Sequence, residues 1–211
     1  MPPAKSAPAQ PENRPYHHGD LRSALLAGAE RTLLEKGVAA LSLRELARDI
    51  GVSHAAPGRH FKDKQALLNA LALAGYERLG DTLDAADDPR LPLQPRLTAL
   101  GRAYLGFAID NAELLALMYA RKHEPGAEEE MAAEVDRTVG SLARVVAAAQ
   151  SRGEIVDGDP EHLTLVAAAA LHGLASFTAN GMLAADAALA SVADVVQHLL
   201  HGLTPRPADP R

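Results

Sequence analysis

The stretch SLRELARDIGVSHAAPGRHFKDKQALL, residues 42–68, decides how the N-terminal part of this chain folds. Ser42 and Glu45 have the spacing of a capping box, in which a serine hydroxyl and a glutamate carboxylate satisfy exposed amides at a helix start. The helix that they begin is short, because Gly51 supplies a left-handed stop. Its apolar residues share one face, which leaves Arg44 on the opposite, solvent-facing side.

A further short helix is expected directly after this turn. Ser53 can cap it, it runs to about Phe61, and Asp63 can cap the helix that follows. A capped helix of about eight residues, a turn of about four and another short helix are typical of a helix-turn-helix, which presents one helix to the DNA major groove. A plain helical bundle with short connections fits the periodicity alone equally well.

Upstream of this stretch, the sequence predicts an arm and one more helix. Residues 1–15 contain five prolines and no hydrophobic periodicity, so we expect a flexible arm. Apolar residues recur every four positions from Leu21 to Leu33, with Asp20 as the expected N-cap and Gly37 as the stop. These boundaries predict a three-helix domain over residues 16–62.

Downstream of Asp63 the sequence predicts helices only, because β-branched residues are sparse and period-two alternation is absent. Asp159 and Pro160 form a clear helix start, an N-cap followed by a proline whose missing amide costs nothing there. The expected helices cover residues 63–84, 95–109, 112–120, 128–152, 160–181 and 187–203. The predicted fold is therefore all-α, a small N-terminal helix-turn-helix domain followed by a larger helical domain over residues 63–205.

Composition excludes several classes of protein. The chain has 211 residues, 47% of them hydrophobic, and is long enough to bury a substantial core. It has no cysteine, which excludes disulfide frameworks, thiol catalysis and cysteine metal sites. Its longest uninterrupted apolar run, Leu165 to Leu171, is far shorter than the roughly 20 residues that span a bilayer, so we expect no membrane helix. Residues 1–15 lack a secretory signal, and the expected location is the cytoplasm.

Charge is divided unevenly along the chain. Residues 1–64 carry ten Lys and Arg against seven Asp and Glu, whereas residues 65–211 carry eleven against twenty, within a net charge of -6. An acidic whole therefore contains a mildly basic N-terminal part, and binding to a polyanion depends on that local field. The charge pattern is thus compatible with DNA as a partner.

Several stretches of the N-terminal part together resemble the TetR-type bacterial transcription regulators. They are Tyr16–Arg22 at the entry to the first helix, Ser42–Ala47 and Ile50–Ser53 around the turn, and Arg59–Leu67 at the end of the recognition helix. They follow one another in the order typical of the family. The resemblance implies a homodimer that binds a roughly palindromic double-stranded DNA operator, most often a repressor released by a small-molecule effector.

The chain also departs from the family pattern. Ala55–Pro57, Leu117–Tyr119 and Leu171–Ala175 resemble a subgroup whose C-terminal domain is called WHG, although the chain has no tryptophan. Where the family usually has a tyrosine that contacts a DNA phosphate, this chain has Gly58. A glycine and the neighbouring Pro57 both weaken a short helix. We therefore expect either a recognition helix that is poorly ordered without DNA or a reduced affinity for DNA.

The residues expected to face DNA differ in their roles. Lys64 lies in the first turn of a helix, where its ammonium and the helix dipole suit a phosphate. Ser53 and His60 can donate to phosphates, whereas Arg44, His54 and Ala55 have the chemistry to meet base edges. The expected DNA-binding set is Arg44, Ser53, His54, Ala55, Arg59, His60 and Lys64.

The larger domain is expected to hold an effector pocket and the dimer interface. Five of the seven aromatic residues lie there, and an apolar pocket between its helices needs only a few polar groups, such as Tyr119 or His172. Aromatic residues at helical spacing fit an ordinary core as well. The last two helices are the expected dimer interface, because small residues over 167–175 permit close packing. The expected pocket residues are Phe107, Leu114, Met118, Tyr119, His172 and Phe177.

Catalysis is not expected, because the residues that it needs do not occur together. His198 and His201 are three apart near the end of the last helix, where the helix dipole explains them better than a metal does. We therefore expect no enzyme activity, no metal site and no cofactor. The competing hypothesis is a helical module that binds a ligand or a protein and has weak or lost operator affinity because of Gly58. Salt separates the two, since DNA affinity falls steeply as salt rises.

Overall fold

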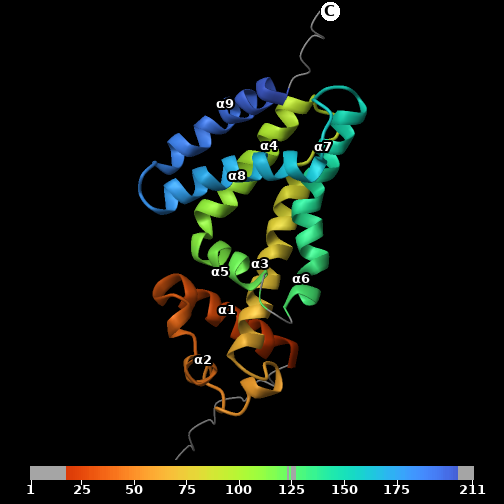
Figure 1. Cartoon of the computed structure of the whole chain (residues 1–211). Coiled ribbons are helices and arrows are strands. Elements are labelled where there is room, and N and C mark those ends of the chain that lie inside the picture. Colours follow the sequence, from red (N-terminus) through yellow and green to blue (C-terminus); the bar gives the residue numbers. More distant parts are fainter. Residues whose placement is uncertain (1–17, 123, 125–126, 204–211) are drawn as a thin grey trace, which may run out of the picture.

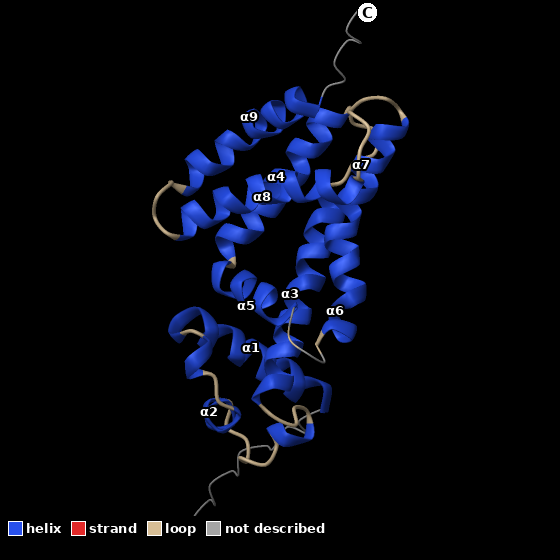
Figure 2. Cartoon of the chain, viewed as in Figure 1, coloured by secondary structure: helices blue, strands red, loops and turns tan. Residues whose placement is uncertain are grey.

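The computed structural model describes residues 18–122, 124 and 127–203, and all the regular elements in these ranges are helical (Figures 1 and 2). This confirms the all-α prediction, whereas the predicted arm over residues 1–15 lies outside the described part. The first elements, up to η2, form the small domain at one end of the molecule, and α8 and α9 lie at the other (Figure 1). In chain order the elements are α1 (His18–Lys36), η1 (Val38–Ala40), α2 (Leu43–Asp49), η2 (Pro57–Arg59), α3 (Lys64–Ala86), α4 (Leu93–Asp110), α5 (Ala112–Lys122), α6 (Glu128–Val135), η3 (Asp136–Gly140), α7 (Ser141–Ser151), α8 (Pro160–Ala179) and α9 (Ala185–Leu203).

Two of the five predicted helix caps are present, and three are not, among them Ser53, since η2 has Ala56 at its N-cap position. The Asp63 carboxylate accepts a hydrogen bond from the Ala66 amide at 2.8 Å, and Asp159 caps α8 in the same way. The predicted capping box is wrong, because Ser42 occupies the N-cap position of α2 without a side-chain cap bond. The predicted N-cap Asp20 is wrong too, since α1 already begins at His18.

The predicted helix over residues 53–61 is instead one 3-10 turn, η2. The Pro57 nitrogen has no hydrogen to donate to the Ser53 carbonyl, which would be its α-helical partner. The Arg59 amide donates to Ala56 at 3.2 Å and the His60 amide to Pro57 at 2.9 Å, which gives the tighter 3-10 spacing. The predicted helix over 128–152 is also interrupted, by the π-helical turn η3 between α6 and α7.

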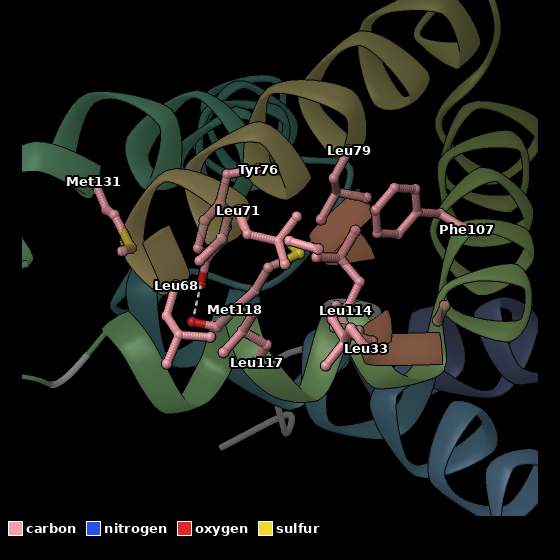
Figure 3. Packing of buried hydrophobic residues seen from close by; sticks show 14 of the residues in the cluster. Leu33, Leu68, Leu71, Tyr76, Leu79, Phe107, Leu114, Leu117, Met118 and Met131 are labelled. Atoms are coloured by element: carbon pink, nitrogen blue, oxygen red, sulfur yellow. Dashed lines mark hydrogen bonds between the residues drawn. The ribbon is translucent and has the colours of Figure 1, made fainter. Parts of the chain in front are cut away.

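One hydrophobic cluster extends through both parts of the molecule. Figure 3 shows the part of it where Leu33 of α1, residues of α3 and residues of α5 come together. Gly75 of α3 is needed for this close approach, because a Cβ there would lie 2.7 Å from the Met118 sulfur. The small domain is therefore packed onto the larger one through α1, α3 and α5. Cluster members from the successive helices include Leu25, Leu33, Leu67, Leu71, Leu105, Leu114, Met118 and Val192.

Helix α8 presents an apolar face that the rest of the chain does not cover. Leu165 is 64% exposed and Phe177 49% exposed. By length and mean hydropathy, α8 qualifies as a candidate membrane span among the described residues, and 11% of the stretch is buried. Length and mean hydropathy alone do not test the expectation that the chain has no membrane helix, since polar residues such as His172 interrupt the apolar run while the mean hydropathy of the stretch stays high.

Candidate functional site

Five of the seven residues expected to face DNA are exposed at the same end of the molecule. Arg44 lies in the first turn of α2, Ser53 to Ala55 follow in the turn after it, and Arg59 ends η2. Within the described part of the chain, Arg44 and Arg59 take part in no ion pair. Both guanidinium groups are therefore available to an external anion or a base edge.

Lys64 and His60 are engaged differently. The Lys64 ammonium donates to the carbonyl oxygens of Val38 at 2.9 Å and Ala39 at 3.3 Å. It thereby ties the start of α3 to η1, and one of its three N–H groups is left for a phosphate. His60 is half-buried, and its Nε2 is buried with no hydrogen-bond partner among the described residues.

Arg22 of α1 also belongs to this end of the molecule, although it is not among the seven residues expected to face DNA. Its guanidinium lies 5.5 Å from the centre of the Phe61 ring, a cation–π distance. Phe61 is 2% exposed and anchors the segment after η2 in the core. Phe61 lies in the stretch Arg59–Leu67 that resembles the family, but no hydrophobic or capping pattern indicates that Arg22 packs on it.

The backbone conformation at Gly58, in the 3-10 turn η2, can be tested by substitution. A Cβ at Gly58 meets no atom within 4 Å, and its φ is not positive, so we expect Gly58→Ala to stabilise the protein by about 0.4–1 kcal/mol. Gly51→Ala is the matched control, because that position is equally open but has φ +74° and should lose about 1–2 kcal/mol. Urea unfolding followed by circular dichroism measures both. Equal destabilisation by the two variants would contradict the prediction that the backbone at Gly58, unlike that at Gly51, accepts a side chain without strain.

A second feature is an apolar cavity of about 150 Å³ in the larger domain. Its walls come from α3, α4, α5, the η3–α7 segment, α8 and α9, and most of the lining side chains are Leu, Val or Ala. Gly101 of α4 lies in this wall where α9 crosses, since a Cβ there would be 2.9 Å from Val192 Cγ1. The polar residues of the lining are Tyr76, Tyr104, Tyr119, Lys122, Thr138, Ser141 and Thr164.

The structure brings only some of the expected pocket residues to this cavity. Met118 and Tyr119 line it. Phe107 and Leu114 are buried but pack in the hydrophobic cluster outside its lining. Phe177 lies on the exposed side of α8, away from the lining, because α8 is apolar on more than one side. The lining residue Lys122 was missed, since a lysine in the last turn of a helix is usually explained by the helix dipole.

His172, another expected pocket residue, does not line the cavity but is hydrogen-bonded to the lining residue Tyr104. The Tyr104 hydroxyl lies 3.0 Å from His172 Nδ1 and 3.2 Å from the Tyr119 hydroxyl, and the Tyr119 and His172 rings meet edge to face at 4.9 Å. Burial raises the pKa of Tyr104 far above its ordinary value, and the neighbouring Tyr119 adds to this. Burial likewise raises the pKa of Tyr76 to about 12. These phenols thus serve as neutral hydrogen-bonding groups.

Polar side chains tie the cavity wall to the helix-turn-helix end. Arg121 of α5 is 9% exposed and donates to Gln65 Oε1 and Asn69 Oδ1, both at 2.8 Å. Gln65 and Asn69 lie in the first two turns of α3. Further along α3, Arg78 bridges Glu30 of α1 at 2.6 Å. The helix α5, which carries three lining residues near its end, is therefore linked directly to the start of α3.

Comparisons with known proteins agree with this architecture. Residues 25–71 match the family model described as bacterial regulatory proteins of the tetR family, and residues 97–203 match the Tetracyclin repressor-like C-terminal domain. HTH-type transcriptional regulators Rv1816 of Mycobacterium tuberculosis and Mb1846 of Mycobacterium bovis are each 37% identical over 120 residues, which is 56% of this chain and 49% of each relative. The chain thus spans about half the length of the curated relatives it matches.

Comparison with solved structures also finds proteins of the same fold. A protein of unknown function from Rhodococcus sp. RHA1 is 44% identical, with a TM-score of 0.83 over 92% of this chain and 100% of that chain. A bacterial regulatory protein in the tetR family from Rhodococcus RHA1, 22% identical, has the same fold with a TM-score of 0.72 over 88% of this chain and 98% of that chain. Since the C-terminal model matches half of the chain and the helix-turn-helix model matches the part before it, the chain belongs to the TetR family of bacterial regulatory proteins, whose members are DNA-binding transcriptional regulators.

Proposed function

We propose that this protein is a cytoplasmic repressor that binds a palindromic operator as a homodimer and leaves it when a small, largely apolar effector occupies the cavity. One observation carries the proposal. The helix α3 begins beside the exposed helix-turn-helix surface and, further along, contributes Tyr76, Leu79 and Leu83 to the cavity wall. The site that senses a ligand and the site that meets DNA thus share one helix.

Each residue of the proposed DNA surface has a role set by its chemistry. Arg44, His54 and Ala55 are exposed on α2 and the turn, where they suit base edges in the major groove. Ser53 and Arg59 are suited to phosphate oxygens, which fix the orientation of the domain without reading sequence. His60 can donate to a phosphate through Nδ1, because its Nε2 is buried. The Lys64 ammonium contributes its remaining N–H to a phosphate while it holds η1 in place.

The uncovered face of α8 supports the homodimer. A single helix-turn-helix buries too little surface for specific binding, so two copies are needed to read a palindrome. Exposed apolar patches of this kind mark interaction surfaces, and here the face runs from Leu165 and Val166 to Phe177 on α8. We place the dimer interface on α8 and α9. We also propose, from the likeness of Leu171–Ala175, that the C-terminal domain belongs to the WHG subgroup.

Release requires that the effector bind the two states with different affinity. A ligand in the cavity contacts α5 near Tyr119, and Arg121 of the same helix holds Gln65 and Asn69 at the start of α3. Movement of α5 therefore shifts the start of α3 together with η1, which Lys64 holds. The spacing of the two DNA-binding domains in the dimer changes as a result.

One observation favours a second candidate function. The segment expected to be the recognition helix is only the 3-10 turn η2, and it contains Gly58 in place of the family's phosphate-binding tyrosine. This favours a helical module that binds a ligand or a protein and has weak or lost operator affinity.

Selection of bound sequences from a random duplex library, at two salt concentrations, tests both candidates. A repressor of this kind enriches a palindrome, and its affinity falls steeply as salt rises. Light scattering of the free and bound protein gives the number of chains per operator. Failure to enrich any sequence, with folding confirmed by circular dichroism, would overturn DNA binding and leave the second candidate.

A further inference from the structure

We infer that the cavity takes a small amphipathic carboxylic acid, whose carboxylate pairs with the Lys122 ammonium and whose apolar part lies among the leucines of the wall. The inference rests on the proposed ligand-responsive function and names the chemical class of its effector. Three features of the cavity carry it, namely its charge, the direction of its hydrogen bonds and its volume.

Lys122 is the one charged side chain that lines the cavity among the described residues. It is half-buried, and within the described ranges it takes part in no ion pair or hydrogen bond. A cation next to an apolar wall is poorly solvated and attracts an anion more strongly than it would in open water. The cavity thus offers an unpaired positive charge to a ligand whose other atoms are apolar.

The hydroxyl groups of Thr138, Ser141 and Thr164 in the lining also favour a ligand whose carboxylate points toward Lys122. Thr138 donates to the Glu134 carbonyl at 3.0 Å, Ser141 to Thr138 at 2.8 Å and Thr164 to Pro160 at 2.7 Å. Their hydrogens are used within their own helices, so these hydroxyls have only lone pairs left. A carboxylate gains nothing from them and must take its hydrogen bonds from another part of the wall.

Tyr119 is placed to supply such a hydrogen bond. It lies three residues before Lys122 on α5, so both side chains share a face of this helix. If His172 Nδ1 carries the proton, it donates to Tyr104, Tyr104 donates to Tyr119, and the Tyr119 hydrogen is free for the ligand. A carboxylate between Lys122 and Tyr119 therefore receives a charge-assisted pair and a hydroxyl hydrogen bond.

The volume limits the apolar part. The cavity measures about 150 Å³, and an engineered apolar cavity of that size in another protein holds benzene. The ligand thus has an apolar part close to one aromatic ring or a chain of about six carbons. A neutral hydrocarbon of this size would fit but leave Lys122 unpaired.

Calorimetric titration of the full-length protein at pH 8 tests the inference with four probes. Hexanoate and benzoate carry the charge, and hexanamide and benzamide are their neutral counterparts of nearly equal size. We expect at least one acid to bind, and to bind at least tenfold more tightly than its amide. The better acid of the two shows whether the cavity prefers a chain or a ring.

Three variants test whether Lys122 causes the preference for an acid over its amide. Lys122→Met should lower acid affinity at least tenfold and leave amide affinity unchanged, whereas Lys122→Arg should retain acid binding. Lys36→Met is the control, because Lys36 is exposed at the end of α1 and does not line the cavity. Equal affinity for acid and amide, unchanged acid binding by Lys122→Met, or no binding of either acid would overturn the inference. Operator selection is measured separately, so that loss of DNA binding is distinguishable from loss of acid binding.

Discussion

Arg44→Ala is expected to weaken binding to the selected operator by about 2–6 kcal/mol, roughly 30-fold to 10⁴-fold. A good bidentate contact between arginine and a base is worth about 1–3 kcal/mol, and a homodimer on a palindrome loses the contact twice. Arg44 is exposed in the first turn of α2 and has no ion-pair partner among the described residues, so the substitution costs the fold little. Fluorescence anisotropy with a labelled operator duplex measures the change.

The matched control for Arg44→Ala is Arg90→Ala. The Arg90 side chain is 89% exposed in the loop between α3 and α4, where it pairs with Asp88, and it lies outside the helix-turn-helix domain. Operators altered at single base pairs separate two roles for Arg44. If Arg44 reads a base, the variant loses discrimination at one position, and if it binds a phosphate, it weakens all sequences alike and lowers the salt dependence. Unchanged affinity would exclude Arg44 from the DNA surface.

Leu33→Ala is expected to lower the free energy of unfolding by about 2–5 kcal/mol, because Leu33 is fully buried in the shared hydrophobic cluster. Its neighbour provides an unusually close control. Leu34 follows it on α1 and is 51% exposed, so Leu34→Ala makes the same chemical change in the same helix and should stay within about 0.5 kcal/mol. Urea unfolding measures both free energies.

The same experiment tests whether the two domains unfold together. Leu33 belongs to the small domain, yet it packs in the cluster that contains Leu114 and Met118 of α5 (Figure 3). We therefore expect one cooperative transition, displaced as a whole by Leu33→Ala. Separate transitions for the two domains, with only the first displaced, would show that the shared cluster does not couple them.

The helices themselves were largely predictable, because their signals are local. Asp63, and Asp159 with Pro160, mark helix starts that the structure confirms, and Gly37 has φ +75° at the predicted end of α1. The sequence also contained the cause of the largest difference between the predicted and the observed helices, which is the replacement of the expected recognition helix by a turn. Pro57 and Gly58 indicated a weak recognition helix, and the structure has the 3-10 turn η2.

The candidate site depends more on contacts between residues far apart in the chain. Lys64 suited a phosphate by its place at a helix start, but its ammonium also holds carbonyls of η1, about 25 residues away. The Arg121 contacts with Gln65 and Asn69 join α5 to α3 and have no signature in either helix. Phe177 was assigned to the pocket because it is aromatic, yet hydrophobic periodicity does not show which side of α8 faces inward.

The length of α3 has a consequence for the size of any regulatory movement. At 23 residues and about 1.5 Å per residue, α3 is a rod of about 35 Å. A tilt of only about 5° about its cavity end displaces its other end by about 3 Å, close to the ~3.4 Å between successive base pairs. In the proposed homodimer each chain carries one such rod, so tilts of a few degrees would suffice to move the two DNA-binding domains out of register with an operator. Under the proposed mechanism, a ligand no larger than a single ring would thus control a contact with DNA many times its own size.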